Sequence, residues 1–348
     1  MLSKIITASA ALTGLVSALP TEKRQNIDTT VLQFALTLEH LENVFYKQAI
    51  QKFSQQDFMK AGYSADYYND LKYIAYDEQQ HVLALSAALT AAGVTPNQAC
   101  QYSFPYTDVP SFITLSSVLE DVGTSAYLGG AGLITSKAYL TVAGSILATE
   151  ARHTAFQRTA IGEVPMPNPF QTPLDPTSVY TLAAMFITSC PTTNTPLPFT
   201  PFPALATDTK TCTCEEPQCG MPSAYIKARD WKNDNWGKEH GWGSTWDPNS
   251  SKSCMPPTAG TQVMFTANGT IKANSYVTFV NGLNVVSVAG KIDGMNISAV
   301  VPSQAMGQTY VFVTSKNENG TLTAGDVEYG PAVLEVAPPA PAIDFSES

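Results

Sequence analysis

The chain has 348 residues, more than one hydrophobic core normally organises, so two or three domains are expected. Only 14% of the residues are charged and 44% are hydrophobic, which is typical of a globular protein and excludes a chain disordered throughout. The net charge of −10 and the lack of a basic cluster argue against a nucleic-acid binder. The motifs of P-loop and dinucleotide-binding enzymes, of α/β-hydrolases and of zinc proteases are also missing.

The N-terminus has the pattern of a secretory signal. Residues 1–18 combine a single Lys4, an apolar run and a small-residue cleavage site. The dibasic pair Lys23-Arg24 predicts a propeptide over residues 19–24. We find no second apolar run long enough to span a bilayer, and the C-terminus lacks the hydrophobic tail of a lipid-anchor signal. The sequence therefore predicts a secreted, extracellular protein without a membrane span.

A helical bundle is predicted over residues 25–190. Apolar residues recur near the 3.6-residue period over 29–50, 64–92, 110–129 and 136–161. Asp28 and Thr29 are candidate caps of the first helix, and Gly93, the pair Gly129-Gly130 and Gly162 are candidate stops of the other three. The sixteen residues 94–109 could extend over the length of a bundle, as one long crossover requires. A further short helix is expected over 176–189.

Residues 191–260 are rich in Pro, Cys and Trp, and this composition predicts an irregular segment. The even number of cysteines in a chain with a secretory signal favours disulfides, although six cysteines allow fifteen pairings. A metal site on Cys212, Cys214 and Cys219 is the weaker alternative. The four tryptophans between Trp231 and Trp246 predict a small core for this segment, and a sugar- or cell-wall-contacting surface is the alternative. The cysteines are Cys100, Cys190, Cys212, Cys214, Cys219 and Cys254.

Residues 261–336 predict a small antiparallel β-sandwich. Short β-rich runs alternate with turn dipeptides such as Asn268-Gly269 and Asn319-Gly320. The tail 337–348 is expected to be disordered. Sequons for N-glycosylation occur only C-terminal to the bundle, at Asn249, Asn268, Asn296 and Asn319. The predicted fold class is thus mainly α plus β, and any N-glycans belong to the C-terminal half.

Chemistry concentrates on the four predicted helices. Glu-x-x-His occurs twice, in the second and fourth helices, and three residues make about one helical turn, so each Glu and its His share a face. The first and third helices each carry a Glu inside an apolar stretch, where a buried carboxylate needs a cation or a network. The candidate metal ligands are Glu39, Glu78, His81, Glu120, Glu150 and His153. Four carboxylates and two neutral imidazoles balance two divalent ions, and these ligands suit Fe or Mn.

This ligand set and the helix order resemble the ferritin-like superfamily. The chain is more closely similar to exported fungal ferritin-like proteins described as stress-response or late-sexual-development proteins, with plant desiccation-related proteins as wider relatives. The resemblance covers about 28–162, and it implies a ferritin-like bundle in which Tyr46 and Tyr127 hydrogen-bond to the metal ligands. Glu42 matches an additional carboxylate of rubrerythrin-type sites, although a solvated glutamate is the expected state. Asp77 and Asp121 adjoin ligands in sequence and are expected to point elsewhere.

The resemblance leaves the reaction open. One hypothesis is a redox enzyme of oxidase, peroxidase or catalase type, in which two Fe or Mn ions react with dioxygen or hydrogen peroxide. The other is a non-catalytic exported stress or cell-wall protein whose metal only stabilises the bundle. Iron storage in a cage is a weaker third hypothesis, because the fused C-terminal segments would hinder a closed shell. The sequence does not determine the oligomeric state.

Overall fold

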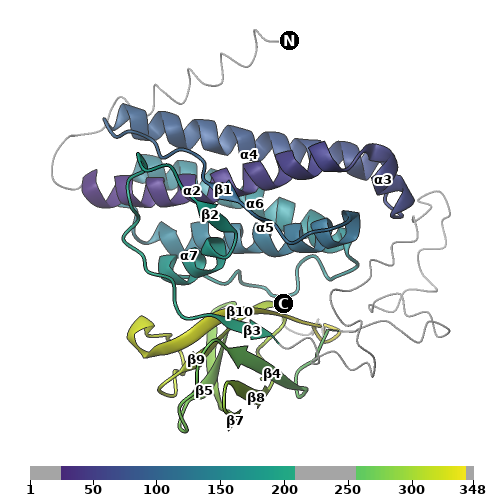
Figure 1. Ribbon diagram of the computed structural model, residues 1–348, viewed down its shortest axis with the longest axis vertical. Coiled ribbons are helices and arrows are strands. Elements are labelled where there is room, and N and C mark those ends of the chain that lie inside the picture. Colours follow the sequence, from purple (N-terminus) through teal and green to yellow (C-terminus); the bar gives the residue numbers. More distant parts are fainter. Residues whose placement is uncertain (1–24, 208–255, 342–348) are drawn as a thin grey trace, which may run out of the picture. The chain divides into compact units, whose positions relative to one another are not determined.

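The computed structural model describes residues 25–207 and 256–341 (Figure 1). These residues divide into two compact units. The helical unit holds the described residues up to Thr154 together with Pro173–Pro201. The β unit holds Ala155–Thr172 and the described residues from Phe202 onward. The predicted signal peptide and propeptide, the tryptophans, Asn249 and four of the cysteines lie outside the described residues, so what we expect of them stays a prediction.

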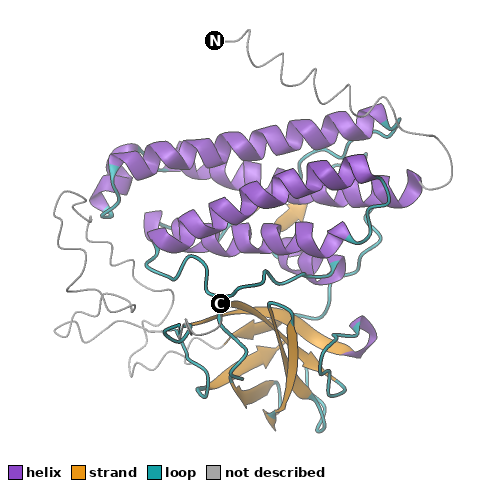
Figure 2. Ribbon diagram, turned by 180° about the vertical axis from the view of Figure 1, so that it is seen from behind, coloured by secondary structure: helices purple, strands orange, loops and turns teal. Residues whose placement is uncertain are grey.

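Four long helices form the predicted bundle, and Figure 2 shows them side by side. Two of them start at clear caps: the Ser64 hydroxyl accepts the N–H of Tyr67 at 3.0 Å, and the Asp108 carboxylate accepts the N–H of Ser111 at 2.9 Å. None of the described helices combines the length and hydropathy of a membrane span. The long helices are α2 (Gln25–Lys52), α4 (Ala65–Ala91), α5 (Val109–Ala131) and α6 (Lys137–Ala160), and the short ones are α3 (Gln55–Lys60) and α7 (Pro176–Ala184).

Two helix ends differ from the expected positions. Helix α2 begins at Gln25, so Asp28 lies within it; its carboxylate accepts the N–H groups of Thr135 at 2.6 Å and Ser136 at 3.1 Å, directly before α6. Helix α5 continues through Gly129 and Gly130, which were expected to end it. A Cβ atom on Gly129 would lie 2.0 Å from the carbonyl oxygen of Leu174, so glycine permits a close backbone approach here.

The connection between α4 and α5 lies along α2. Near the start of α2, the side chain of Gln33 donates to the carbonyl of Thr95 at 2.7 Å. At its end, Lys52 donates to the carbonyl of Tyr106 at 3.2 Å. Because these contacts lie at opposite ends of α2, the connection runs the length of the bundle. The predicted single long crossover is therefore confirmed.

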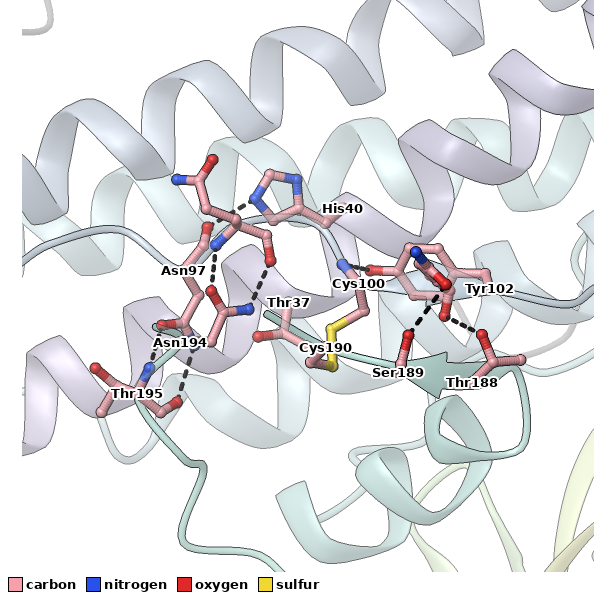
Figure 3. Close-up of a disulfide and its surroundings, with 12 residues drawn as sticks. Thr37, His40, Asn97, Cys100, Tyr102, Thr188, Ser189, Cys190, Asn194 and Thr195 are labelled. Carbon is pink, nitrogen blue, oxygen red and sulfur yellow. Dashed lines mark hydrogen bonds between the residues drawn. A yellow bond between two sulfur atoms is a disulfide. The ribbon is translucent and has the colours of Figure 1, made fainter. Parts of the chain in front are cut away.

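A disulfide joins this crossover to the segment after α7. Cys100 and Cys190 are bonded across a sequence separation of 90 residues (Figure 3). Directly beside the bond, β1 (Gln101–Tyr102) pairs antiparallel with β2 (Ile187–Ser189). The expected helix over 176–189 was therefore too long: α7 ends at Ala184, because the residues of β2 form backbone pairs with the crossover.

The β unit contains two four-stranded antiparallel sheets. Their strand orders are β10-β9-β5-β6 and β3-β4-β8-β7. Residues expected to be irregular contribute one edge strand, β3, which pairs with β4. The strands are β3 (Leu205–Thr207), β4 (Gln262–Ala267), β5 (Tyr276–Asn281), β6 (Asn284–Ala289), β7 (Lys291–Asp293), β8 (Asn296–Val300), β9 (Gly307–Thr314) and β10 (Val327–Val336).

Alternating apolar residues of both sheets meet in one core, as the period-2 pattern predicts. Phe265 of β4 and Phe279 of β5 lie in this core with ring centroids 6.4 Å apart, packed with Val311 of β9. The expected antiparallel β-sandwich is confirmed. The sequon residues Asn268 and Asn319 are exposed on it, which leaves both side chains accessible for the predicted glycans.

A pair of partly buried glutamates in the β unit, Glu163 and Glu335, predicts a pH effect. Arg158 binds Glu335 through two hydrogen bonds of 3.0 and 2.7 Å, and Glu163 lies beside this pair. Burial and the charge of Glu335 raise the pKa of Glu163 to about 7, although Arg158 acts to lower it. Because the folded chain keeps this proton above the usual pKa of 4.5, the unfolding free energy should fall as pH rises from 4.5 to 7.

Replacing Glu163 by Gln should remove that loss. Relative to the wild type, Glu163→Gln should gain about 1–3 kcal/mol of unfolding free energy between pH 5 and pH 8, at roughly 1.4 kcal/mol per pKa unit. Urea unfolding of both proteins at the two pH values measures the difference. The control Asp293→Asn, at an exposed position in β7, should change little. An equal effect of Glu163→Gln at both pH values would contradict the prediction.

Candidate metal centre

Each long helix of the bundle places one glutamate at a common buried point. Helix α2 carries Glu39, α4 carries Glu78, α5 carries Glu120 and α6 carries Glu150. All four side chains are fully buried, at 0% exposure. Four carboxylates do not share a dry core without compensating positive charge, so this arrangement requires protons or cations.

The two histidines complete this cluster from the same helices. The Nδ1 atom of His81 lies 3.2 Å from both Glu39 and Glu150 and 3.5 Å from Glu78. The Nδ1 atom of His153 lies 3.0 Å from Glu78 and 3.2 Å from Glu120. Each imidazole therefore directs one nitrogen at carboxylate oxygens of neighbouring helices. The same nitrogen of His81 also faces Glu78, one turn away on its own helix.

These six residues form two overlapping groups that can hold metal. One group is Glu39, Glu78, His81 and Glu150, and the other is Glu78, Glu120, Glu150 and His153; within each group, the potential ligand atoms all lie within 4.8 Å of one another. Glu78 and Glu150 belong to both groups. The structure thus brings all six candidate ligands together, with the glutamates of the two Glu-x-x-His elements in the middle.

The hydrogen bonding of this cluster is incomplete. Both carboxylate oxygens of Glu78 and of Glu150, Oε2 of Glu120 and Nδ1 of His153 are buried and make no hydrogen bond of good geometry, although the imidazole nitrogens lie 3.0–3.5 Å from these carboxylates. Such atoms are costly in a protein interior unless something coordinates them. Carboxylate oxygens and imidazole nitrogens are suitable ligands for a divalent transition metal. The donor set therefore fits a metal centre.

The electrostatics agree with this fit. Burial raises the pKa of Glu78 to about 7, helped by the charges of Glu120 and Glu39 and opposed by the histidines. Burial and neighbouring carboxylates also raise the pKa of Glu150 well above its usual range. Burial alone would lower the pKa of His81, but the facing carboxylates outweigh it and raise that pKa instead. Without metal, the cluster holds protons at neutral pH; bound cations would take their place.

Two tyrosines bind the outer glutamates across the bundle. The hydroxyl of Tyr46 on α2 donates to Glu120 on α5, and the hydroxyl of Tyr127 on α5 donates to Glu39 on α2. Each tyrosine follows a glutamate by seven residues on its own helix, yet it binds the glutamate of the opposite one. These reciprocal bonds hold the two outer carboxylates in place, as residues around a metal commonly do.

Glu42 belongs to the site, contrary to the expectation of a solvated side chain. It is only 4% exposed, and burial and the charges of Glu150 and the other cluster carboxylates raise its pKa. A Cβ atom on Gly123 would lie 2.7 Å from a Glu42 oxygen and 3.0 Å from a Glu150 oxygen. Gly123 on α5 therefore makes room for both carboxylates. The apolar neighbours of Glu42 in the sequence were the signal for its burial.

Asp77 was also wrongly expected to point away from the site. Its carboxylate lies 3.2 Å from Nε2 of His153. The two ring nitrogens of His153 thus face different groups: Nδ1 faces the buried glutamates, and Nε2 faces Asp77 at the edge of the bundle. Adjacent residues on α4 can both reach this ring, because it offers a nitrogen on each side. Asp77 is therefore placed to orient His153 toward a metal.

We predict that Asp77→Asn weakens metal binding by roughly 10- to 100-fold, the usual effect of removing a carboxylate behind a ligating histidine. A competition titration with a metal chelator measures this loss. Asp70→Asn is the control, since Asp70 is exposed on the same helix. Equal affinities for the two variants would show that Asp77 does not orient His153.

Comparison with known proteins agrees with the helical fold. Residues 27–163 match the ferritin-like domain family. The helical part of this chain is therefore similar to ferritin-like domains, which confirms the resemblance to the ferritin-like superfamily. Protein rds1 of Schizosaccharomyces pombe is 29% identical over 180 residues. That match covers 52% of this chain and 44% of the relative, so the chain spans less than half the length of the fungal protein it matches.

Proposed function

We propose that this chain is an exported ferritin-like protein that binds two Fe or Mn ions and uses them in redox chemistry with dioxygen or hydrogen peroxide. One observation carries the proposal. The two candidate metal-binding groups share Glu78 and Glu150, while each has its own histidine and its own outer glutamate. Two ions, one held by each group, would use every member of both groups.

The charges support the same stoichiometry. Four glutamates contribute four negative charges, which two divalent ions neutralise while both imidazoles stay neutral. With a single ion, two of these buried glutamates would still have to be neutralised by protons, a role that a second cation can take instead. A single ion would also leave one histidine facing carboxylates without a metal. We therefore expect close to two ions in each chain.

A bound pair of Fe(II) ions would supply the two electrons that, with two protons from solvent, reduce dioxygen to hydrogen peroxide. The chain's own residues hold and enclose the reactants. Tyr46 and Tyr127 fix the outer glutamates through their hydroxyl groups. The surrounding apolar side chains, among them Leu38 and Leu119, exclude bulk water from the centre.

Two assays test the redox proposal. Metal-loaded protein should oxidise added Fe(II) in air or consume hydrogen peroxide, and the variant Glu78→Ala with Glu150→Ala should do neither above background. A protein that binds two ions but matches this variant in both assays would not be a redox enzyme. The alternative is then a structural metal that joins four helices, since the ligands come from all four.

The place of action is also part of the proposal. The predicted signal peptide, the dibasic site and the exposed sequon residues Asn268 and Asn319 support export and glycosylation. A role in stress response or development is proposed from the resemblance to exported fungal proteins. Mass spectrometry of protein secreted by a eukaryotic host tests export; an intact Met1 in the secreted chain would contradict it.

A further inference from the structure

The helical unit contains an apolar cavity beside the candidate metal centre. Its volume is about 50 Å³, and side chains of α2, α4, α5 and α6 line it. Ala35, Leu38, Ala88 and Ala143 are among these, together with Tyr127 and Tyr139. Ala35 is only partly buried, so the cavity lies close to the surface of the bundle there.

The cavity is one side chain away from the metal ligands. The ring of Tyr127 lines it, and the hydroxyl of the same residue donates to Glu39. Leu38, which precedes Glu39, lines it as well and also borders a smaller pocket of about 20 Å³ with Glu42 and Gly123. A small molecule in the cavity would therefore be held next to the carboxylates that bind the metal.

The cavity does not exist because the backbone of α5 requires a glycine at this point. Gly130 lines the cavity inside α5, and a Cβ atom added there would meet nothing within 4 Å. Alanine would be about 1 kcal/mol more favourable at a helix position of this kind. Gly129 beside it differs, because Leu174 leaves no room for a Cβ atom. At Gly130, glycine therefore preserves an open volume that packing does not demand.

The apolar side chains that line the cavity determine which small molecule it can bind. Water and hydrogen peroxide need several hydrogen-bond partners, and a cavity with apolar walls stays dry. Dioxygen needs no hydrogen bonds, and the volume is too small for a long organic chain. We propose that this cavity is a binding site for dioxygen that serves the metal centre. The proposal rests on the redox function proposed above and specifies its oxidant as dioxygen rather than peroxide.

Dissolved dioxygen is itself the probe, because it is paramagnetic and broadens the NMR signals of nearby methyl groups. In the full chain without paramagnetic metal, oxygen pressure should broaden the methyl signals of Leu38, Ala88 and Ala143 more than those of Leu71, which is buried in α4 away from the cavity. Equal broadening at all four residues would overturn the proposal. This measurement does not depend on any activity of the protein.

Two variants at one position and a matched control complete the test. Gly130→Ala should reduce the selective broadening and Gly130→Leu should abolish it. Gly144→Ala, at an exposed glycine of α6 that also has free space, should leave it unchanged. If broadening persists in a correctly folded Gly130→Leu protein, dioxygen lies elsewhere and the proposal is wrong.

Activity then separates this proposal from the redox function. With metal content unchanged, Gly130→Leu should require a higher oxygen concentration for half-maximal Fe(II) oxidation, while any peroxide consumption should match the wild type. An unchanged oxygen dependence would refute a role for the cavity and leave the redox function intact. Selective broadening in a wild type that neither oxidises Fe(II) nor consumes hydrogen peroxide would refute the redox function. It would also refute the cavity's service to the metal, though not its affinity for dioxygen.

Discussion

Replacing Glu78 and Glu150 together by Ala should abolish metal binding by this protein. These two glutamates are the members common to both candidate groups, so their loss leaves each prospective ion with only one carboxylate and one histidine. Such a pair binds weakly compared with a preorganised set of four ligands from rigid helices. Elemental analysis of the purified proteins should find close to two ions per chain in the wild type and none in the double variant.

The control for this result changes the neighbouring residues instead. Gln79 directly follows Glu78 and Arg152 lies two residues after Glu150, and both side chains are exposed, so Gln79→Ala with Arg152→Ala is a matched change on the same helices. It should retain both ions. Two ions in the Glu78 and Glu150 variant would refute the assigned site, and one ion in the wild type would refute the dinuclear centre.

The isosteric pair Glu78→Gln with Glu150→Gln separates lost charge from lost volume. It should also lose the metal, because an amide is a poor ligand compared with a carboxylate. The metal-free form of this variant should nevertheless be more stable than metal-free wild type at pH 7, by about 1–4 kcal/mol, since the folded wild type must keep protons on two carboxylates whose pKa burial raises. Urea unfolding in the presence of a chelator measures the difference. A less stable variant would show that these carboxylates stabilise the empty bundle.

The second large effect concerns the Cys100–Cys190 disulfide. Replacing both cysteines by Ser should lower the unfolding free energy of the helical unit by about 2–5 kcal/mol, because the bond closes a long loop in the unfolded chain. The bond joins the crossover to the segment after α7. Urea unfolding followed by far-UV circular dichroism, which reports the helices, measures this loss.

Two further measurements make this prediction specific. Wild-type protein treated with a reducing agent should unfold like the double Ser variant. Ser189→Ala, next to the bond, removes only a hydrogen bond to Gln101 at an exposed position and should cost less than about 1 kcal/mol. A Cys100→Ser and Cys190→Ser protein as stable as the wild type would show that β1, β2 and the crossover contacts suffice to hold these segments.

The helices and the candidate metal ligands follow from the amino-acid sequence alone. A helix repeats every 3.6 residues, so the apolar period predicted α2, α4, α5 and α6, and the spacing of Glu78 from His81 predicted a shared face. An acidic residue inside an apolar stretch must be compensated, and this rule identified Glu39 and Glu120 as candidate ligands. These are local rules, and they work because each concerns one helix at a time. The β-sandwich followed in the same way from its alternating strands.

How the helices meet is a property of the tertiary structure. The packing of the bundle pairs Tyr46 with Glu120 and Tyr127 with Glu39, although each tyrosine shares a helix with the other glutamate. It also buries Glu42, because Gly123 on a different helix leaves room for it. Such contacts depend on how one helix is rotated and shifted against its neighbour, which no period within a single helix encodes.

The same reason explains the other differences from the sequence-based expectations. Asp77 reaches His153 because the ring extends from α6 toward α4. Two adjacent residues of α4, Asp77 and Glu78, can therefore face the same ring. Helix α5 continues through Gly130, where the sequence predicted its end. The missing side chain borders a cavity there instead of ending the helix. The periodicity along each helix thus determined which residues are buried, and the packing between helices determined which of them touch.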